Sequence, residues 1–207
     1  MSGQGKSDFI VLEGPDGSGK STQARLLAEK LAAQGRECLL VREPGGTALG
    51  ERVREILLDK AETGMDARGE LFLFLACRAQ LVAEVIRPAL ARGAVVLSDR
   101  FMLSTLVYQG IAGGLPLAEI REAGRIATGG LAPELTLVLD VPAEIGLSRR
   151  PGAQDRIEMK GVEFHRRVRE GYLSLAREDS SARVIDGARP LAEVEKSVWE
   201  LAHAVLC

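Results

Sequence analysis

The chain has 207 residues, of which 46% are hydrophobic and 27% are charged, and its formal net charge is −2 at pH 7. This length and apolar content allow one sizeable core, and no long linker or low-complexity stretch divides the chain, so we expect a single domain over residues 1–207. The near-neutral charge argues against a general electrostatic grip on nucleic acid, although local arginines can still hold a small phosphorylated ligand.

The first predicted element is a strand at residues 9–13, which follows a polar, glycine-rich segment (residues 1–7) where we expect a frayed, disordered end. The sequence GPDGSGKS, residues 14–21, comes directly after this strand, and a helical pattern with Ala24 and Leu27 on one face comes next. A glycine-rich turn that matched the motif by accident would not be expected to lie between a predicted strand and a predicted helix. The context is that of a phosphate-binding loop.

Each residue type in this loop has a use in binding nucleotide phosphates. Gly14, Gly17 and Gly19 let backbone N–H groups surround phosphate oxygens at a helix N-terminus. Lys20, expected to be solvated, can reach the outer phosphates, and the Ser21 hydroxyl can bind Mg²⁺. The predicted ATP-binding residues are Gly14, Pro15, Asp16, Gly17, Ser18, Gly19, Lys20, Ser21 and Thr22.

A second strand is predicted at residues 37–41, and the turn sequence REPGG follows it, ahead of a helix that carries Arg54. Alone, an arginine such as Arg54 is more often a solvated surface charge than a ligand contact. Apolar residues at helical spacing between about 67 and 92 predict one extended helix that ends near Gly93. This helix carries Phe74 and Arg78, and by itself a phenylalanine at this spacing is more often a core residue than a stacking surface.

A third strand is predicted at residues 94–98, and Asp99 and Arg100 follow at its carboxyl end. In a phosphate-loop protein this position favours Asp99 as a Mg²⁺ partner, partly through water, and Arg100 as a fork between donor and acceptor phosphates. The plainer interpretation is a salt bridge at the end of a strand.

Two more strands are predicted at residues 135–140 and 183–186, and a last helix at 191–205. Between them, residues 148–160 read SRRPGAQDRIEMK, a short basic segment ahead of a helix from about Val162. We expect a mobile flap, or lid, that delivers an arginine to the transferred phosphoryl group. A solvated basic loop is the alternative.

The alternation of strands and helices predicts an α/β fold, a five-stranded parallel sheet with helices on both faces, of the phosphate-loop kinase type. Ligands should bind beyond the carboxyl ends of the strands. The sequence has three cysteines without a CxxC pair, no signal pattern and no apolar stretch of membrane length. We therefore expect a cytoplasmic protein without a membrane partner. The near-neutral charge predicts no nucleic-acid partner.

Across residues 9–206 the sequence resembles the bacterial thymidylate kinase family. The shared segments are FIVLEGPDGSGKSTQ, REPGGT, LFLFLACR, SDRFMLSTLVYQG, PELTLVLDV, DRIE and HRRVREGYLSLA. The resemblance implies transfer of the ATP γ-phosphoryl group to dTMP, with Mg²⁺, in dTTP synthesis, and small-molecule partners. It also implies a homodimer, which the apolar residues between Leu71 and Leu90 favour as well.

The resemblance further implies how the acceptor base and sugar are bound. Phe74 would stack on thymine, and Arg78 would bind the carbonyl edge of the base. Thr105 and Gln109 would complete base recognition, and Tyr108 would line the deoxyribose.

For the phosphate end, the resemblance implies that Arg54 and Arg100 hold the dTMP phosphate and that Tyr172 closes over the acceptor. Asp16 and Glu43 would line the space between the two nucleotides. The predicted dTMP-binding residues are Glu43, Arg54, Phe74, Arg78, Arg100, Thr105, Tyr108, Gln109 and Tyr172.

Family members carry an assisting arginine in the phosphate loop or in the flap, and residues 15–18 contain none. The flap must therefore supply it, which leaves Arg149, Arg150 or Arg156. Arg150 is the first choice because it precedes the Pro-Gly bend, and Arg156 is the second because neighbouring acids compete for it. The predicted catalytic residues are Lys20, Arg100, Arg150, Arg156 and Asp16.

Three other functions remain as alternatives. A kinase for a different nucleoside monophosphate would keep the loop and flap and change the surroundings of Phe74, Arg78 and Gln109. A GTP-dependent switch protein would carry an Asn-Lys-x-Asp signature, which this sequence lacks. A nucleic-acid ATPase would usually have a second acid beside Asp99, where this chain has an arginine.

Overall fold

The five parallel strands that the sequence predicts form one sheet, and the structure shows their order to be β2-β3-β1-β4-β5. The computed structural model describes residues 8–61, 64–149 and 156–206. The strands are β1 (Phe9–Glu13), β2 (Cys38–Arg42), β3 (Val95–Asp99), β4 (Leu135–Asp140) and β5 (Ala182–Asp186). β1 lies at the centre, so the loops that follow β1 and β3 meet at the same edge.

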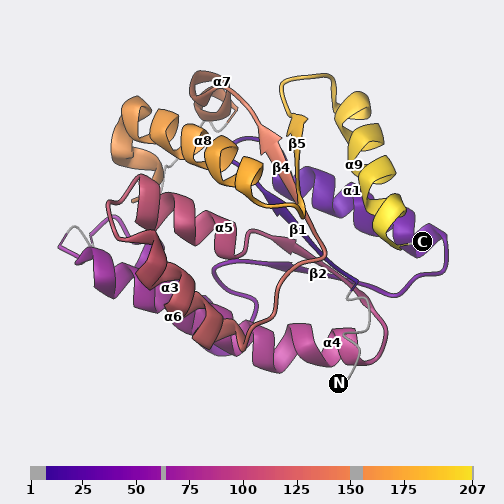
Figure 1. Ribbon diagram of the computed structural model, residues 1–207, viewed down its shortest axis with the longest axis horizontal. Helices are drawn as coiled ribbons and strands as arrows, with labels where there is room; N and C mark the ends of the chain where they lie inside the picture. The colour runs from indigo at the N-terminus through magenta and orange to yellow at the C-terminus, as the bar shows by residue number, and fades with distance from the viewer. Residues whose placement is uncertain (1–7, 62–63, 150–155, 207) are drawn as a thin grey trace.

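Helices cover both faces of this sheet (Figure 1). The α-helices are α1 (Lys20–Ala33), α2 (Ala48–Leu58), α3 (Ala67–Leu81), α4 (Arg87–Ala91), α5 (Met102–Thr105), α6 (Leu117–Thr128), α7 (Ala143–Ser148), α8 (Gly161–Glu178) and α9 (Leu191–Leu206). The π-helices are η1 (Val82–Ile86) and η2 (Leu106–Ile111), and η3 (Glu158–Lys160) is a 3₁₀-helix. Within the described ranges, none of these helices combines the length and apolarity needed to cross a membrane.

The side chains of β1 alternate between the two faces, which explains why all five of its residues are buried. Ile10 and Leu12 pack in a cluster with residues of α1 and α9, the two helices that lie side by side to the right of the strands in Figure 1. Phe9 and Val11 pack on the opposite face with residues of η1 and α4. A strand buried on both faces carries almost no polar side chain, so Glu13 at its end is exceptional.

The extended helix expected between residues 67 and 92 is present, but a wide turn interrupts it. α3 passes into the π-helix η1 and then into α4, which ends before Gly93. Pro88 lies in the first turn of α4 and has no N–H to donate to the carbonyl four residues earlier. The Arg87 N–H donates instead to the Val82 carbonyl, five residues back, which is the π-helical bond.

Candidate active site

A cavity of about 550 Å³ opens beside the carboxyl ends of β1 and β3, the edge at which parallel α/β sheets bind ligands. The predicted site residues in its wall are Asp16, Gly17, Gly19, Lys20, Ser21, Thr22, Glu43, Arg54, Phe74, Arg78, Asp99, Arg100, Thr105, Tyr108 and Gln109. Residues between positions 16 and 109 thus converge on one space. Five predicted residues in the described ranges are not wall residues: Gly14, Pro15, Ser18, Arg156 and Tyr172.

The phosphate loop has the tight backbone that its glycines allow. Gly17 has φ +73°, and a Cβ at this position would lie 2.0 Å from the Gly146 carbonyl oxygen, so only glycine fits. The loop turns inward and surrounds the Lys20 ammonium, which donates to the carbonyl oxygens of Gly14 (3.1 Å) and Pro15 (2.8 Å). Backbone carbonyls of the loop therefore surround the Lys20 cation.

Lys20 is not the solvated side chain expected from the sequence, because only 6% of the residue is exposed. Burial, together with the nearby Arg100 guanidinium, lowers the pKa of its ammonium to about 8. Carbonyl oxygens of the same loop take the place of water around this ammonium. The Lys20 charge is thus held in a partly desolvated position where phosphate oxygens would stabilise it.

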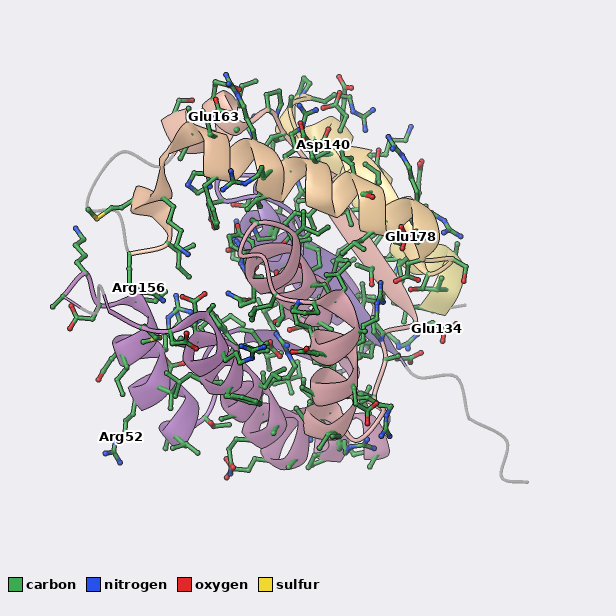
Figure 2. The ribbon with its side chains drawn as sticks, turned by 60° about the vertical axis from the view of Figure 1, so that its left-hand side comes forward. Arg52, Glu134, Asp140, Arg156, Glu163 and Glu178 are labelled. Atoms are coloured by element: carbon green, nitrogen blue, oxygen red, sulfur yellow. The ribbon has the colours of Figure 1, made fainter. Side chains whose placement is uncertain are left out.

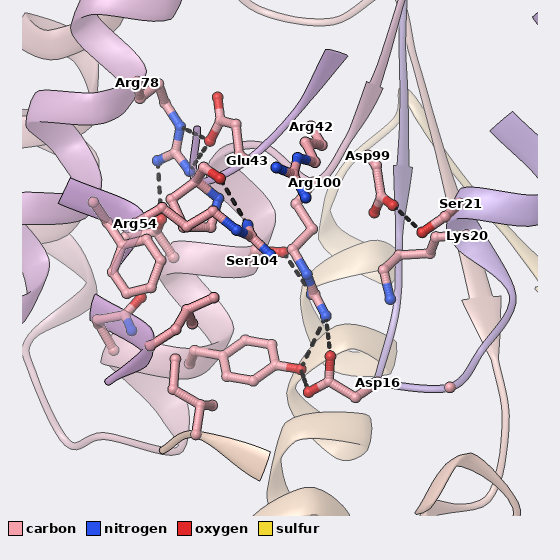
Figure 3. Close-up of a pocket in the computed structure, with 18 of the residues that line it drawn as sticks. Asp16, Lys20, Ser21, Arg42, Glu43, Arg54, Arg78, Asp99, Arg100 and Ser104 are labelled. Atoms are coloured by element: carbon pink, nitrogen blue, oxygen red, sulfur yellow. Dashed lines mark hydrogen bonds and ion pairs between the residues drawn. The ribbon is translucent and has the colours of Figure 1, made fainter. Parts of the chain in front are cut away.

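Ser21 and Asp99, the predicted metal pair, lie together at one end of the cavity (Figure 3). The Ser21 hydroxyl donates to Asp99 Oδ2 over 2.5 Å. A hydroxyl and a carboxylate are the oxygen ligands that Mg²⁺ prefers, so the pair fits this ion. In the described part of the chain, no three His, Cys, Asp or Glu residues gather as a metal cage. A cation here would complete its shell with phosphate oxygens and water.

Arg100 occupies the middle of the cavity, between the metal pair and the acceptor end (Figure 3). Its backbone has φ +77°, an uncommon value for a residue other than glycine, which turns the chain sharply after β3. The guanidinium pairs with Asp16 Oδ1 at 2.5 Å and also donates to the Ser104 hydroxyl at 3.1 Å. Its position matches the predicted fork between two phosphates.

Behind Arg100 lies a buried polar cluster around Glu13, which sequence reasoning missed. Glu13 is fully buried and accepts from the backbone N–H of Phe101 (2.8 Å) and from both the N–H (3.1 Å) and hydroxyl (2.5 Å) of Ser104. Burial raises the pKa of this carboxyl, and these hydrogen bonds oppose the rise. An acid that ends an otherwise apolar, fully buried strand was the available signal.

Tyr172 belongs to this cluster, which corrects the expectation that it closes over the acceptor. The residue is 1% exposed, donates to Glu13 Oε2 (3.1 Å) and accepts from Arg100 Nη1 (3.0 Å). α8 packs against η2 and β4, so its inward face points Tyr172 at the back of the arginine. Tyr172 therefore orients Arg100, while Tyr108 lines the cavity and donates to Asp16 Oδ2 over 2.8 Å.

The far end of the cavity contains an aromatic ring and a buried ion pair. Arg78 is 1% exposed; its Nε donates to Glu43 Oε2 (2.6 Å) and its Nη1 to the Thr105 hydroxyl (2.9 Å). Half-buried Phe74 lies on the same helix one turn earlier and faces the cavity. A planar base would find here a ring face and a fixed guanidinium edge.

Arg54 is half-buried in the cavity wall, so the surface-charge interpretation is wrong. Its Nη1 donates to the Pro44 carbonyl oxygen over 2.7 Å, which holds the side chain across the REPGG turn. Two residues of the REPGG segment itself, Arg42 and Pro44, also line the cavity and were not predicted. Their position directly after β2 was the signal.

The flap arginines have different surroundings. Arg150 lies outside the described residues. Arg149, at the end of α7, lines the cavity and donates to the Gly187 carbonyl oxygen over 3.0 Å. Arg156 is not a wall residue; its guanidinium pairs with Glu70 Oε2 on α3 at 2.5 Å (its place is labelled in Figure 2). The structure thus places Arg156 beside α3, and the adjacent Ile157 in the cavity wall.

Comparison with known proteins gives the same family as the motifs. The family model described as thymidylate kinase matches residues 12–198 of this chain. A thymidylate kinase of Symbiobacterium thermophilum is 50% identical over 202 residues, which cover 97% of this chain and 94% of that protein. A thymidylate kinase of Pseudomonas savastanoi pv. phaseolicola is 52% identical over 201 residues, which cover 96% of each chain.

Among solved structures, the crystal structure of thymidylate kinase from Ehrlichia chaffeensis is similar, with a TM-score of 0.78 and 32% sequence identity. The match covers 94% of this chain and 97% of that chain. It confirms the predicted α/β nucleotide kinase fold.

Proposed function

The chain belongs to the thymidylate kinase family, and we propose that it transfers the γ-phosphoryl group of ATP to dTMP, forming dTDP and ADP in dTTP synthesis. One observation carries this proposal: the phosphate loop and the Ser21–Asp99 pair share a single cavity with Phe74, Arg78 and Gln109. The phosphate loop and the Ser21–Asp99 pair suit a nucleoside triphosphate. Phe74, Arg78 and Gln109 suit a flat base with polar edges.

In the reaction, an oxygen of the dTMP phosphate attacks the γ-phosphorus, and the bond from that phosphorus to the β-phosphate oxygen breaks. The attacking oxygen is already anionic at neutral pH, so no side chain has to remove a proton. The protein's task is to align two polyanions that repel each other and to neutralise the charge between them.

The described residues divide this task by position. Lys20 would hold the outer phosphates of ATP, and Arg100 would bridge the two nucleotides, with Asp16 and Tyr172 fixing its guanidinium and Glu13 holding Tyr172. Arg54 would bind the acceptor phosphate. Ser21 and Asp99 would hold Mg²⁺, which supplies charge neutralisation at the β- and γ-phosphates.

We also propose a flap over residues 148–160, one kinase domain, a homodimeric assembly and a cytoplasmic location. Cys38 and Cys77 are free thiols in the described part of the chain, which is typical of a reducing compartment.

A phosphorylation assay over dTMP, dUMP, dCMP, AMP and GMP, with and without Mg²⁺, tests the function. We expect ATP- and Mg²⁺-dependent turnover with the highest kcat/KM for dTMP. Preference for another monophosphate would establish a kinase of different specificity, and ATP hydrolysis without transfer would overturn the kinase assignment.

A further inference from the structure

Gln109 holds a fixed position at the acceptor end of the cavity. It lies in η2, is 4% exposed and forms part of the cavity wall. Its Nε2 donates to Glu70 Oε1 over 2.7 Å. Glu70, on α3, is itself only 6% exposed. A buried carboxylate therefore supports the amide that faces the space where a base would bind.

The second oxygen of Glu70 is also engaged. Arg156 Nη2 donates to Glu70 Oε2 at 2.5 Å, and the same guanidinium donates from Nε (3.2 Å) and Nη2 (3.1 Å) to the Leu57 carbonyl at the end of α2. Figure 2 labels Arg156 where the segment before α8 approaches the lower helices. Arg156 is thus fixed by backbone at one side and by Glu70 at the other.

This arrangement determines which way the Gln109 amide turns. A carboxylate accepts hydrogen bonds and donates none, and the guanidinium of Arg156 occupies the other oxygen of Glu70. The amide must therefore turn its nitrogen towards Glu70. Its oxygen then points away from Glu70, with the second N–H of the nitrogen as the neighbouring donor.

An acceptor beside a donor matches only some base edges. Thymine and uracil present a ring N–H beside a carbonyl oxygen, which pairs with the amide oxygen and with the remaining N–H of Gln109. Cytosine presents the reverse, a ring nitrogen that accepts beside an amine that donates, and would need the amide turned over. Turning it would place the amide oxygen against the Glu70 carboxylate, and two acceptors repel.

We propose that Glu70 is a specificity-determining positioning residue: held by Arg156, it locks the Gln109 amide in the orientation that accepts thymine or uracil and rejects cytosine. This inference rests on the proposed function, because it takes the acceptor to be a pyrimidine monophosphate. It gives Arg156 a role in substrate selection in place of the catalytic role predicted from the sequence.

The test replaces Glu70 by an amide of the same shape, Glu70→Gln, which can either donate to or accept from Gln109. Binding of dTMP, dUMP and dCMP is measured by calorimetry, or as competitive inhibition where affinity is low. We expect affinity for dTMP and dUMP to fall by the same factor, about tenfold, while that for dCMP is unchanged or rises. The KM for ATP should not change.

Glu200→Gln is the matched control, because Glu200 is an exposed acid on α9 whose partner is Lys196. It should leave all three affinities unchanged. An equal loss for dTMP, dUMP and dCMP in Glu70→Gln would mean that Glu70 only maintains structure, and no loss would also overturn the proposal.

A second variant, Arg156→Met, keeps the proposal testable if Glu70→Gln does not fold. Without the guanidinium, the second oxygen of Glu70 loses the contact that fixes its carboxylate, so Glu70 holds the Gln109 amide less firmly. The ratio of dTMP to dCMP affinity should therefore fall, and an unchanged ratio contradicts the proposal. Wild-type protein that fails to phosphorylate dTMP would instead refute the proposed function, independently of these ratios.

Discussion

At the scale of single residues, Lys20 combines a functional charge with a buried position. Three loop acceptors surround its ammonium, including the Ser18 hydroxyl at 3.4 Å, and no core side chain depends on it. We expect Lys20→Ala to lower kcat about a thousandfold, because a cation aimed at the transferring phosphates is lost. Steady-state kinetics measures the effect, and circular dichroism should report an unchanged fold. Turnover within tenfold of wild type would contradict the loop assignment.

The lowered pKa of Lys20 predicts proton uptake when ATP binds. The folded value of about 8 lies below the ordinary value of 10.5, so the charge of Lys20 costs stability below pH 8 and this cost disappears as pH rises from 8 to 10.5. Phosphate oxygens favour the charged form and raise the pKa. Calorimetry at pH 9 in two buffers of different ionisation enthalpy should therefore show uptake of a fraction of a proton in wild type.

Lys20→Met serves as the control for this measurement, because methionine cannot titrate. Any uptake that remains in Lys20→Met comes from other groups. Equal uptake in both proteins at pH 9 would mean that ATP does not contact Lys20.

Arg78 is predicted to affect one substrate and also stability. Arg78→Ala should raise the KM for dTMP far more than that for ATP, since its guanidinium lies at the acceptor end of the cavity. The change also leaves Glu43 buried and without its cation, which costs roughly 3 kcal/mol of the free energy of unfolding. Kinetics and urea denaturation measure the two effects separately.

The double variant Glu43→Gln/Arg78→Ala separates these causes, because it removes both charges. Much of the stability should return while the KM for dTMP stays high. Equal effects of Arg78→Ala on the KM of dTMP and of ATP would place Arg78 outside the acceptor site.

At the scale of elements, the proposed flap connects α7 to α8, and we expect its arginines to have different roles. Arg149 lies in the cavity wall at the end of α7, whereas Arg156 is bound to α2 and α3. Charge that develops on the transferred group still needs a cation from this segment, since the phosphate loop carries no arginine. Arg150 stays the first candidate.

We expect Arg150→Ala to lower kcat more than about tenfold with a smaller change in the KM for dTMP, the pattern of an interaction made mainly in the transition state. Arg156→Ala should instead act mainly on the KM for dTMP. Parallel kinetics of Arg149→Ala, Arg150→Ala and Arg156→Ala measures this. If only Arg149→Ala lowers kcat, the arginine at the end of α7 is the catalytic one, and if none does, the flap mechanism is wrong.

At the scale of the whole molecule, two large apolar side chains stand exposed on adjacent helices. Phe72 on α3 is 60% exposed and Ile126 on α6 is 67% exposed. Helical spacing puts Phe72 on the face of Arg68, and Ile126 on the face of Glu119, and the Arg68–Glu119 ion pair joins these two faces. Burial of this surface against a second copy would remove both side chains from water.

Light scattering at micromolar concentration should therefore give the mass of a dimer, and Phe72→Glu should shift it to monomer because a charge would be buried at the interface. Leu191→Glu, at a position on α9 that is 57% exposed, is the control and should stay dimeric. A wild-type monomer would refute the assembly, and a dimeric Phe72→Glu protein would place the interface elsewhere.

The sequence alone determined the features that depend on neighbours along the chain. The phosphate loop is such a feature, because its strand, glycines and helix are contiguous, and so is the Asp99–Arg100 pair at the end of β3. Apolar runs predicted all five strands, with boundaries within one residue of those observed. In β1, β3 and β4 the run is continuous because these strands are buried on both faces of the sheet. Pro88 already indicated the turn within the long helix, but the periodicity of the flanking residues concealed it.

Tertiary structure decided the contacts between residues that are far apart in the sequence. Glu13 meets Tyr172 across 159 positions, and Glu70 meets Arg156 across 86. Neither pair follows from spacing, because the packing of α8 on the sheet and of the segment before α8 on α2 and α3 brings the partners together. Burial then changes what each group does: it removes water from Lys20, turns Tyr172 into a support for Arg100, and makes Glu70 the partner that orients Gln109. The sequence determines which side chains are present. Their solvation and their hydrogen-bond partners are determined only by the packing of the folded chain.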